Sequence, residues 1–314
     1  MAISKKLEIL EAHPEYYEKL MQMETIQIQT PAFLQTLAYM EECLVLSQRQ
    51  VEPSCMMLTG ETGTGKSTVM KEFERHYPKI EHDTFVEVPI LRASVPLPVT
   101  ISNMMTNLLA SLKDPASDRG TQAQKATRLN KLLIGCKVRM IILDEFQHLI
   151  EGKSQHNNSN VSDWLKTLIN ETRIPVVLCG MPTAKGVLSC NPQLMRRFQY
   201  YVQFKPFSWV SDQRTFENML LKIDKELPFK ASAGLANGDM PLRLMVASGG
   251  NISRLMKYIR GAAGLALLSQ KRCVQMEDFA EHYETHSMEV GVNPFTAGKR
   301  ELERMANPQK EEVA

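Results

Sequence analysis

The stretch 60–68 places the strongest constraint on the fold of this 314-residue chain. It satisfies the pattern G-x-x-x-x-G-K-[ST] in full and reads Gly60-Glu61-Thr62-Gly63-Thr64-Gly65-Lys66-Ser67-Thr68. In this pattern glycines allow backbone conformations and a close approach that side chains would block. Consecutive backbone N–H groups and the lysine then surround a polyphosphate, while the serine hydroxyl ligates Mg²⁺. The sequence therefore predicts a nucleoside triphosphate site.

The residues on either side of this loop have the patterns that such a site needs. An apolar run at 55–58 precedes it and predicts a buried strand, and residues 69–75 predict a helix. The alternative is a turn rich in Gly and Thr that binds no ligand. The strand before and the helix after the loop disfavour that alternative, because together they form the expected context of a phosphate-binding loop.

A second motif occupies residues 139–149. Four apolar residues, 140–143, predict a strand that is buried on both faces, as in a parallel sheet. Asp144 and Glu145 follow directly, and two carboxylates at the end of a buried strand are costly unless they meet a metal or hydrogen-bond donors. We expect Asp144 to hold Mg²⁺ and Glu145 to orient or deprotonate an attacking water.

Strand and helix patterns alternate through the first two thirds of the chain. A helical stripe at 161–169 is followed by a core strand at 174–180. This alternation predicts an α/β fold with a doubly wound parallel sheet. From residue 207 onward helical patterns dominate, so a smaller helical domain is expected there. The predicted divisions are an N-terminal helical arm (1–50), an α/β nucleotide-binding domain (51–206), a helical lid (207–288) and a flexible tail (289–314).

Overall charge gives little indication of a nucleic-acid partner, since the formal net charge is only +2 and the pI is about 8.1. Any such surface must be local. Residues 113–139 contain seven basic residues against two acidic ones. Alone, this excess is more typical of a solvated helix face than of a phosphate-binding surface. The candidate DNA contacts in it are Lys113, Arg119, Thr121, Lys125, Arg128 and Lys131.

The remaining composition indicates an ordinary soluble protein. The six cysteines contain no C-x-x-C pair, which favours reduced core thiols over a zinc site or a disulfide framework. The N-terminus has no apolar segment typical of a secretory signal, and no apolar run approaches the ~20 residues of a membrane span. The sequence thus predicts a cytoplasmic protein with no membrane partner.

Three arginines in the second half are candidates for contacts with the triphosphate. Arg196 and Arg197 follow a short helical run, and either could neutralise charge on the γ-phosphate of an adjacent subunit. A surface ion pair or a cation at a helix C-terminus explains them equally well. Arg254 follows Gly249-Gly250-Asn251 in the first turn of a predicted helix, with Asn251 as the predicted N-cap.

Together these motifs resemble the AAA+ ATPases and, more narrowly, the TniB/TnsC family of transposition regulators found in CRISPR-associated and related transposons. The resemblance covers residues 30–285 and rests on four motifs. These are the phosphate-binding loop, Leu-Asp-Glu-Phe-Gln-His-Leu, Leu-Met-Arg-Arg-Phe and Gly-Gly-Asn-Ile-Ser-Arg.

The resemblance implies a role for each motif. Lys66 and Ser67 bind phosphates and Mg²⁺, and Asp144 and Glu145 form the Walker B pair. Arg196 or Arg197 is the arginine finger, and Arg254 resembles the sensor-2 arginine of the lid. The chain departs from the family where a polar sensor-1 residue is usual, because Gly180-Met181-Pro182 stands there before Thr183. Thr183 is the candidate substitute, and slow ATP hydrolysis is expected.

The resemblance also implies partners. Similar proteins polymerise on duplex DNA in the ATP state, as rings or helical oligomers, and link a TniQ-type target selector to transposase subunits. DNA contact independent of sequence is expected, with weak contacts multiplied over many subunits. Two alternatives stay open. One is a helicase loader or replication initiator with the same AAA+ parts, and the other is a P-loop enzyme that transfers phosphate to a small molecule or nucleoside without assembly.

Overall fold

The computed structural model describes residues 14–47, 52–151, 155–189, 191–287 and 291–306. The chain forms two compact units. One contains residues 31–204, and the other combines residues 1–30 with residues 205–314.

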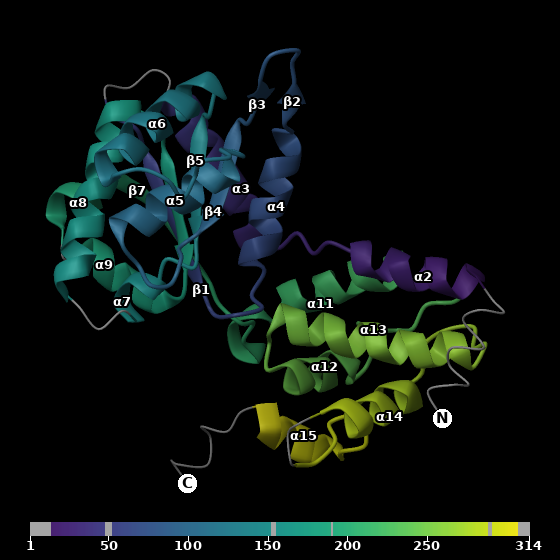
Figure 1. Cartoon of the computed structure of the whole chain (residues 1–314). Coiled ribbons are helices and arrows are strands. Elements are labelled where there is room, and N and C mark those ends of the chain that lie inside the picture. The colour runs from purple at the N-terminus through teal and green to yellow at the C-terminus, as the bar shows by residue number, and fades with distance from the viewer. Residues whose placement is uncertain (1–13, 48–51, 152–154, 190, 288–290, 307–314) are drawn as a thin grey trace, which may run out of the picture. The chain divides into compact units, whose positions relative to one another are not determined.

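A five-stranded sheet forms the centre of the α/β unit (Figure 1). Its strand order is β4-β5-β6-β1-β7, and every neighbouring pair is parallel. The predicted doubly wound parallel sheet is therefore confirmed. The strands are β1 (Cys55–Gly60), β4 (Ile90–Ser94), β5 (Met140–Asp144), β6 (Val176–Gly180) and β7 (Phe198–Phe204).

Alternate residues of each strand face two helical layers. On β1, for example, Met57 packs with one layer, whereas Met56 and Leu58 pack with the other. Both faces of the sheet are covered, which explains why these strands read as continuous apolar runs. The layer beside Met57 includes α5 (Ile101–Ser111), α6 (Gln122–Gly135), α8 (Gln155–Thr172) and α9 (Lys185–Ser189), and the layer beside Met56 contains α3 (Pro31–Leu46) and α4 (Lys66–His76).

Short elements complete this unit. A two-stranded hairpin of β2 (Ile80–Glu81) and β3 (Val86–Glu87) precedes β4, and Pro89 separates β3 from β4 as its missing N–H predicts. Pro89 still accepts backbone hydrogen bonds from Arg139 and Met140. The others are α7 (His148–Glu151), α10 (Pro192–Met195) and a 3₁₀ turn (Pro182–Ala184).

The second unit is a helical bundle built around α13, with one continuous apolar cluster (Figure 1). Asn251 caps α13 as predicted, accepting from the backbone N–H groups of Ser253 and Arg254 at 3.0 and 3.2 Å. The helices are α2 (Pro14–Thr25), α11 (Trp209–Glu226), α12 (Met240–Ser248), α13 (Ile252–Leu268), α14 (Met276–His286) and α15 (Lys299–Ala306).

The expected arm of residues 1–50 does not form one element. Helix α3 belongs to the α/β unit, whereas α2 packs on α13 in the helical unit. Met23 is buried in the helical cluster, and Arg260 donates to the carbonyl oxygens of Met23 and Glu24 at 3.0 and 3.3 Å. Residues 1–13 and 48–51 of the expected arm lie outside the described residues.

Residues 291–306 of the expected flexible tail are packed against the helical unit. Phe295 is only 3% exposed, and its ring stacks on Phe279 with centroids 5.2 Å apart. Arg243 donates to the carbonyl oxygens of Pro294 and Ala297 at 2.6 and 3.1 Å. A flexible segment is the wrong description for this part of the tail, while residues 288–290 and 307–314 lie outside the described residues.

This packing predicts a large stability cost for Phe295→Ala. We expect the variant to lower the free energy of unfolding of the helical unit by about 3–4 kcal/mol, because a buried aromatic ring would leave a cavity. Urea unfolding followed by circular dichroism measures the change. Tyr17→Ala is the control, since that ring is 56% exposed and its loss is expected to cost less than about 0.5 kcal/mol. Equal stability of the two variants would contradict the described packing.

None of the helices in the described residues combines the length and the apolar composition needed to cross a lipid bilayer.

Candidate nucleotide-binding site

The phosphate-binding loop joins the end of β1 to the start of α4. Gly60 ends the strand and Lys66 begins the helix. The Lys66 ammonium folds back and donates to the carbonyl oxygens of Gly60 and Glu61 at 2.6 and 2.8 Å. Thr64 is buried and its hydroxyl also donates to Glu61 O, at 2.8 Å. These bonds hold the loop in a compact turn around the lysine.

Two glycines of the loop occupy positions that other residues would strain. A Cβ atom on Gly60 would lie 2.6 Å from the carbonyl oxygen of Phe204 on the neighbouring strand β7. Gly65 has a φ of +104° and forms the N-cap of α4. A backbone contact therefore explains the glycine at position 60, and a left-handed backbone conformation explains the glycine at position 65.

The loop presents unused hydrogen-bond donors at the start of α4. Among the described residues, no hydrogen bond occupies the backbone N–H groups of Gly63, Gly65, Lys66 or Ser67. N–H groups at a helix N-terminus, together with the helix dipole, form a favourable site for an anion. Ser67 is exposed at the same helix end. The loop thus fits the phosphates of a nucleotide, with Ser67 available to a metal ion.

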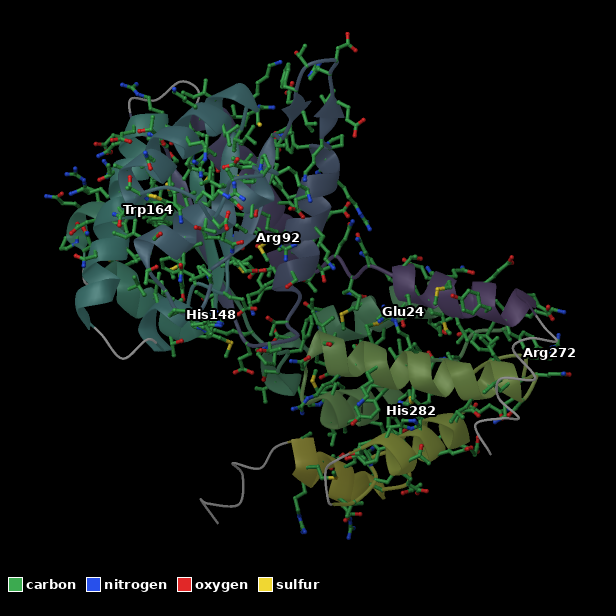
Figure 2. All side chains as sticks on the ribbon, in the orientation of Figure 1. Glu24, Arg92, His148, Trp164, Arg272 and His282 are labelled. Carbon is green, nitrogen blue, oxygen red and sulfur yellow. The ribbon has the colours of Figure 1, made fainter. Side chains whose placement is uncertain are left out.

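Asp144 lies at the carboxyl end of β5, at the same edge of the sheet as the loop, because the strands are parallel. It is 7% exposed, and one of its carboxylate oxygens accepts from Arg92 Nη2 at 2.9 Å. Arg92, labelled in Figure 2, lies on the neighbouring strand β4 and also pairs with Glu74 at 3.5 Å. The guanidinium thus compensates the buried charge of Asp144.

Glu145 follows Asp144 with an exposed side chain and a φ of +57°, a left-handed conformation that is uncommon for residues other than glycine. The side-chain amide of Gln147 donates to the Glu145 carboxylate. Gln147 is itself buried, and its Oε1 accepts from the backbone N–H of Met181 at 3.0 Å. The general-base candidate is therefore held by a side chain two residues further along.

The segment after β6 carries no polar side chain in contact with Asp144 or Glu145 among the described bonds. Thr183, the predicted substitute for sensor 1, is exposed on the 3₁₀ turn. The polar side chain next to Glu145 is instead Gln147.

Burial raises the pKa of the Cys179 thiol, on β6, well above its ordinary value, and the charge of Asp144 raises it further. Cys179 is thus an uncharged neighbour of Asp144.

The two adjacent arginines have opposite environments. Arg197 is 6% exposed, donates to Asn170 Oδ1 at 2.6 Å and lies 3.7 Å from Glu52. The Arg196 side chain is 68% exposed and lies 4.0 Å from Glu52. Only Arg196 therefore presents its guanidinium to solvent, where another molecule can meet it. Arg197 holds α8 and the end of α10 together.

Arg254 lies in the first turn of α13, as predicted, and is exposed. It belongs to the helical unit, so its part in nucleotide binding stays a prediction.

The basic section divides into side chains bound within the protein and side chains exposed to solvent. Lys125 is 6% exposed and its ammonium donates to the hydroxyls of Ser102 and Thr106 at 3.3 and 2.9 Å. Arg128 donates to the Asp114 carboxylate at 2.6 Å and to the carbonyl oxygen of Arg119 at 3.0 Å. These two residues stabilise the α5–α6 connection. The exposed residues of the set are Lys113, Arg119, Thr121 and Lys131.

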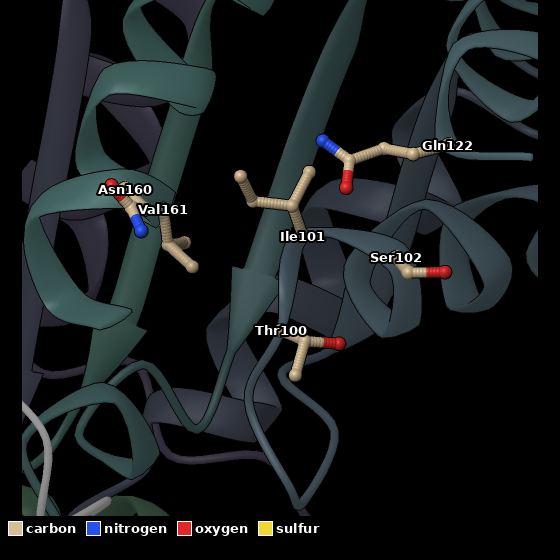
Figure 3. A pocket seen from close by; sticks show the side chains of 6 residues that line it. All are labelled: Thr100, Ile101, Ser102, Gln122, Asn160 and Val161. Carbon is tan, nitrogen blue, oxygen red and sulfur yellow. The ribbon is translucent and has the colours of Figure 1, made fainter. Parts of the chain in front are cut away.

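A pocket of about 130 Å³ lies where α5 and α6 begin (Figure 3). Figure 3 shows Ile101 between Gln122 on one side and Val161 on the other. None of the lining residues belongs to the phosphate-binding loop or to the segment containing Asp144 and Glu145. The pocket is therefore separate from the nucleotide site. Its lining residues are Thr100, Ile101, Ser102, Gln122, Asn160 and Val161.

Sequence reasoning missed Arg92 and Gln147. The sequence contained a signal for Arg92. Arg92 is a charged residue inside the otherwise apolar run 90–93. A charged side chain is rarely buried in a strand unless it is paired with a partner. Gln147 stands two residues after Glu145 in the same motif, but sequence alone gave no reason to connect its amide with that carboxylate.

A scan against protein families matches residues 20–207 to the family described as "Bacterial TniB protein". This span is more than half of the chain and includes the phosphate-binding loop, Asp144, Glu145 and both adjacent arginines. The chain belongs to the TniB family. The predicted resemblance to the TniB family is thereby confirmed. A search of curated proteins gives no match for this TniB-family chain.

Solved structures show the same fold at low sequence identity. Cdc6p from Pyrobaculum aerophilum has a TM-score of 0.59 and 16% identity over 86% of this chain and 72% of its own. The Aeropyrum pernix ORC1 protein, solved in complex with DNA, has a TM-score of 0.57 and 17% identity over 83% and 66%. The Thermotoga maritima RuvB Holliday junction branch migration motor has a TM-score of 0.50 and 14% identity over 87% and 73%.

These likenesses confirm the predicted AAA+ P-loop fold of this TniB-family protein. Family and fold together support the predicted ATPase activity.

Proposed function

We propose that this TniB-family protein is an ATP-dependent regulator of transposition that assembles on duplex DNA in the bacterial cytoplasm and links target selection to transposase recruitment. The observation that carries the proposal is the placement of Lys66, Ser67, Asp144 and Glu145 at one edge of one parallel sheet, within the span that matches the family. Its partners would be further copies of itself, transposase subunits and a target selector of the TniQ type.

Each residue of the site would have a separate role in ATP hydrolysis. Lys66 and the N–H groups at the start of α4 bind and orient the phosphates. Glu145 accepts a proton from the attacking water. Ser67 and Asp144 would hold Mg²⁺, which supplies positive charge against the β- and γ-phosphates. Asp144 is paired with Arg92 in this structure, so binding requires that this contact be shared or released.

The assembly proposal rests on Arg196. Its guanidinium is exposed at the end of α10, where it would serve as the arginine finger toward the triphosphate of a neighbouring copy. Arg254 would act as the lid arginine within the same protomer.

The proposed DNA surface is the exposed part of the basic section, Lys113, Arg119 and Lys131. Arg128 fixes the backbone beside Arg119 through its contacts to Asp114 and to two carbonyl groups. Each protomer would add a few phosphate contacts that carry no sequence information, and assembly would multiply them.

The alternative reading, a helicase loader or replication initiator, is supported only by the shared fold. The match to the TniB family favours transposition.

Electron microscopy of the full chain with duplex DNA tests the proposal. We expect oligomers with ATP or a slowly hydrolysed analogue, and their loss with ADP. In binding assays, Arg119→Ala/Lys131→Ala is expected to weaken DNA affinity at least about tenfold and to flatten its salt dependence. Lys71→Ala/Lys79→Ala removes the same charge from exposed positions and is the control. Dispersed particles with every nucleotide, or equal losses in both variants, would contradict the proposal.

A further inference from the structure

Gln147 makes contacts that neither nucleotide binding nor the proposed roles of other residues explain. Its side chain is 5% exposed, and both ends of its amide are used. Nε2 donates to the Glu145 carboxylate, and Oε1 accepts from the Met181 N–H at 3.0 Å. A buried amide with both ends bonded has one orientation, so the carboxylate that it contacts is also restrained.

The backbone around Gln147 is shaped to admit this side chain. A Cβ atom on Gly180 would lie 2.6 Å from Gln147 Oε1, so the end of β6 has to be glycine for the amide to reach Met181. The N–H of Phe146 donates to the carbonyl oxygen of Cys179 at 2.8 Å and fixes the two segments together. The contact is therefore built into the ends of β5 and β6.

Met181, which donates to Gln147, also contacts the phosphate-binding loop. The Thr62 hydroxyl donates to the sulfur of Met181 at 3.9 Å. Thr62 belongs to the loop, so a continuous series of contacts runs from Thr62 through Met181 and Gln147 to Glu145.

We propose that Gln147 is a positioning residue for ATP hydrolysis, an inference that rests on the proposed function. By binding one carboxylate oxygen of Glu145, it leaves the other oxygen available to the attacking water. Glu145 is exposed and has a left-handed backbone conformation, so its side chain would otherwise sample several rotamers. Holding a reacting group in one geometry increases the rate without tighter substrate binding. Gln147 also supplies the polar side chain that the segment 180–182 lacks.

Two variants separate the functions of the amide. Gln147→Glu keeps an acceptor for Met181, removes the donor to Glu145 and adds a negative charge. Gln147→Met has a similar size and removes both bonds. The control is Gln35→Glu, the same chemical change at an exposed position on α3, where the described side-chain bond goes to the hydroxyl of Tyr39. Each full-length variant is assayed for kcat, KM for ATP and thermal unfolding.

For Gln147→Glu we expect kcat to fall about thirtyfold, with KM for ATP within about threefold of wild type. For Gln147→Met we expect a similar loss of kcat, again with KM for ATP within about threefold of wild type. The Gln35→Glu variant should match wild type.

An unchanged kcat in both Gln147 variants would overturn the inference, and so would a faster rate. A loss of kcat in proportion to a loss of folded protein would also overturn it, because a purely structural role predicts that result. These outcomes in an active wild-type protein leave the proposed function intact. A wild-type protein that hydrolyses no ATP would instead contradict the proposed function together with the inference.

Discussion

Replacing Glu145 by glutamine is expected to lower kcat for ATP hydrolysis by about a thousandfold while ATP binding is retained. The amide has nearly the shape of the carboxylate and its oxygen can still accept from Gln147, so the site should keep its structure. It cannot accept the proton of the attacking water. Steady-state hydrolysis together with binding of a fluorescent ATP analogue measures the two quantities separately.

Glu171→Gln is the matched control, since this carboxylate is exposed on α8 and accepts from Asn130 at 2.9 Å. Its kcat should equal that of wild type. If Glu145→Gln retains more than about a tenth of the wild-type kcat, another group acts as the base, and the role assigned to Glu145 is wrong.

The adjacent arginines are expected to give opposite results when each is replaced by alanine. Arg196→Ala should lower kcat of the assembled protein by about a thousandfold without changing its stability, as removal of an arginine finger does. Arg197→Ala should lower the free energy of unfolding of the α/β unit by about 3 kcal/mol, because it leaves a cavity in place of a buried side chain and removes the bond from that side chain to Asn170.

Chemical unfolding and ATPase assays on both variants distinguish these effects. The two substitutions remove the same side chain from neighbouring positions, so each serves as the control for the other. Hydrolysis that fails only in a destabilised Arg197→Ala, with Arg196→Ala fully active, would contradict the assignment.

Much of the α/β unit could be predicted because its signals are local. A glycine-rich loop between an apolar run and a helix, and an apolar strand ending in Asp144 and Glu145, specify both the parallel sheet and its functional edge. In the helical unit, Asn251 as the N-cap of α13 is likewise determined by its immediate neighbours.

Tertiary contacts account for what sequence patterns did not predict. The apolar residues of α2 indicate a helix with a buried face, but they do not say which core buries it. Phe295 follows Asn293-Pro294, a sequence typical of a loop. Its ring is nevertheless buried among three aromatic rings of the helical unit. Lys125 reads as a surface lysine because its partners, Ser102 and Thr106, lie on another helix.

The same limit applies to the site. Arg196 and Arg197 are chemically identical, and only the geometry at the end of α10 separates an exposed guanidinium from a buried one. The partners of the two carboxylates depend on strand order. Arg92 reaches Asp144 because β4 lies beside β5, and Gln147 reaches Met181 because β6 lies on the other side.

Mixing two inactive variants tests the central claim, that neighbouring protomers share each triphosphate, most directly. Glu145→Gln lacks the base but keeps Arg196, whereas Arg196→Ala keeps the base but lacks the finger. On duplex DNA an equimolar mixture should recover on the order of a quarter of the wild-type ATPase rate, since sites that combine Glu145 of one protomer with Arg196 of the next are complete. A mixture as inactive as its two components, under conditions where wild type is active, would contradict the account.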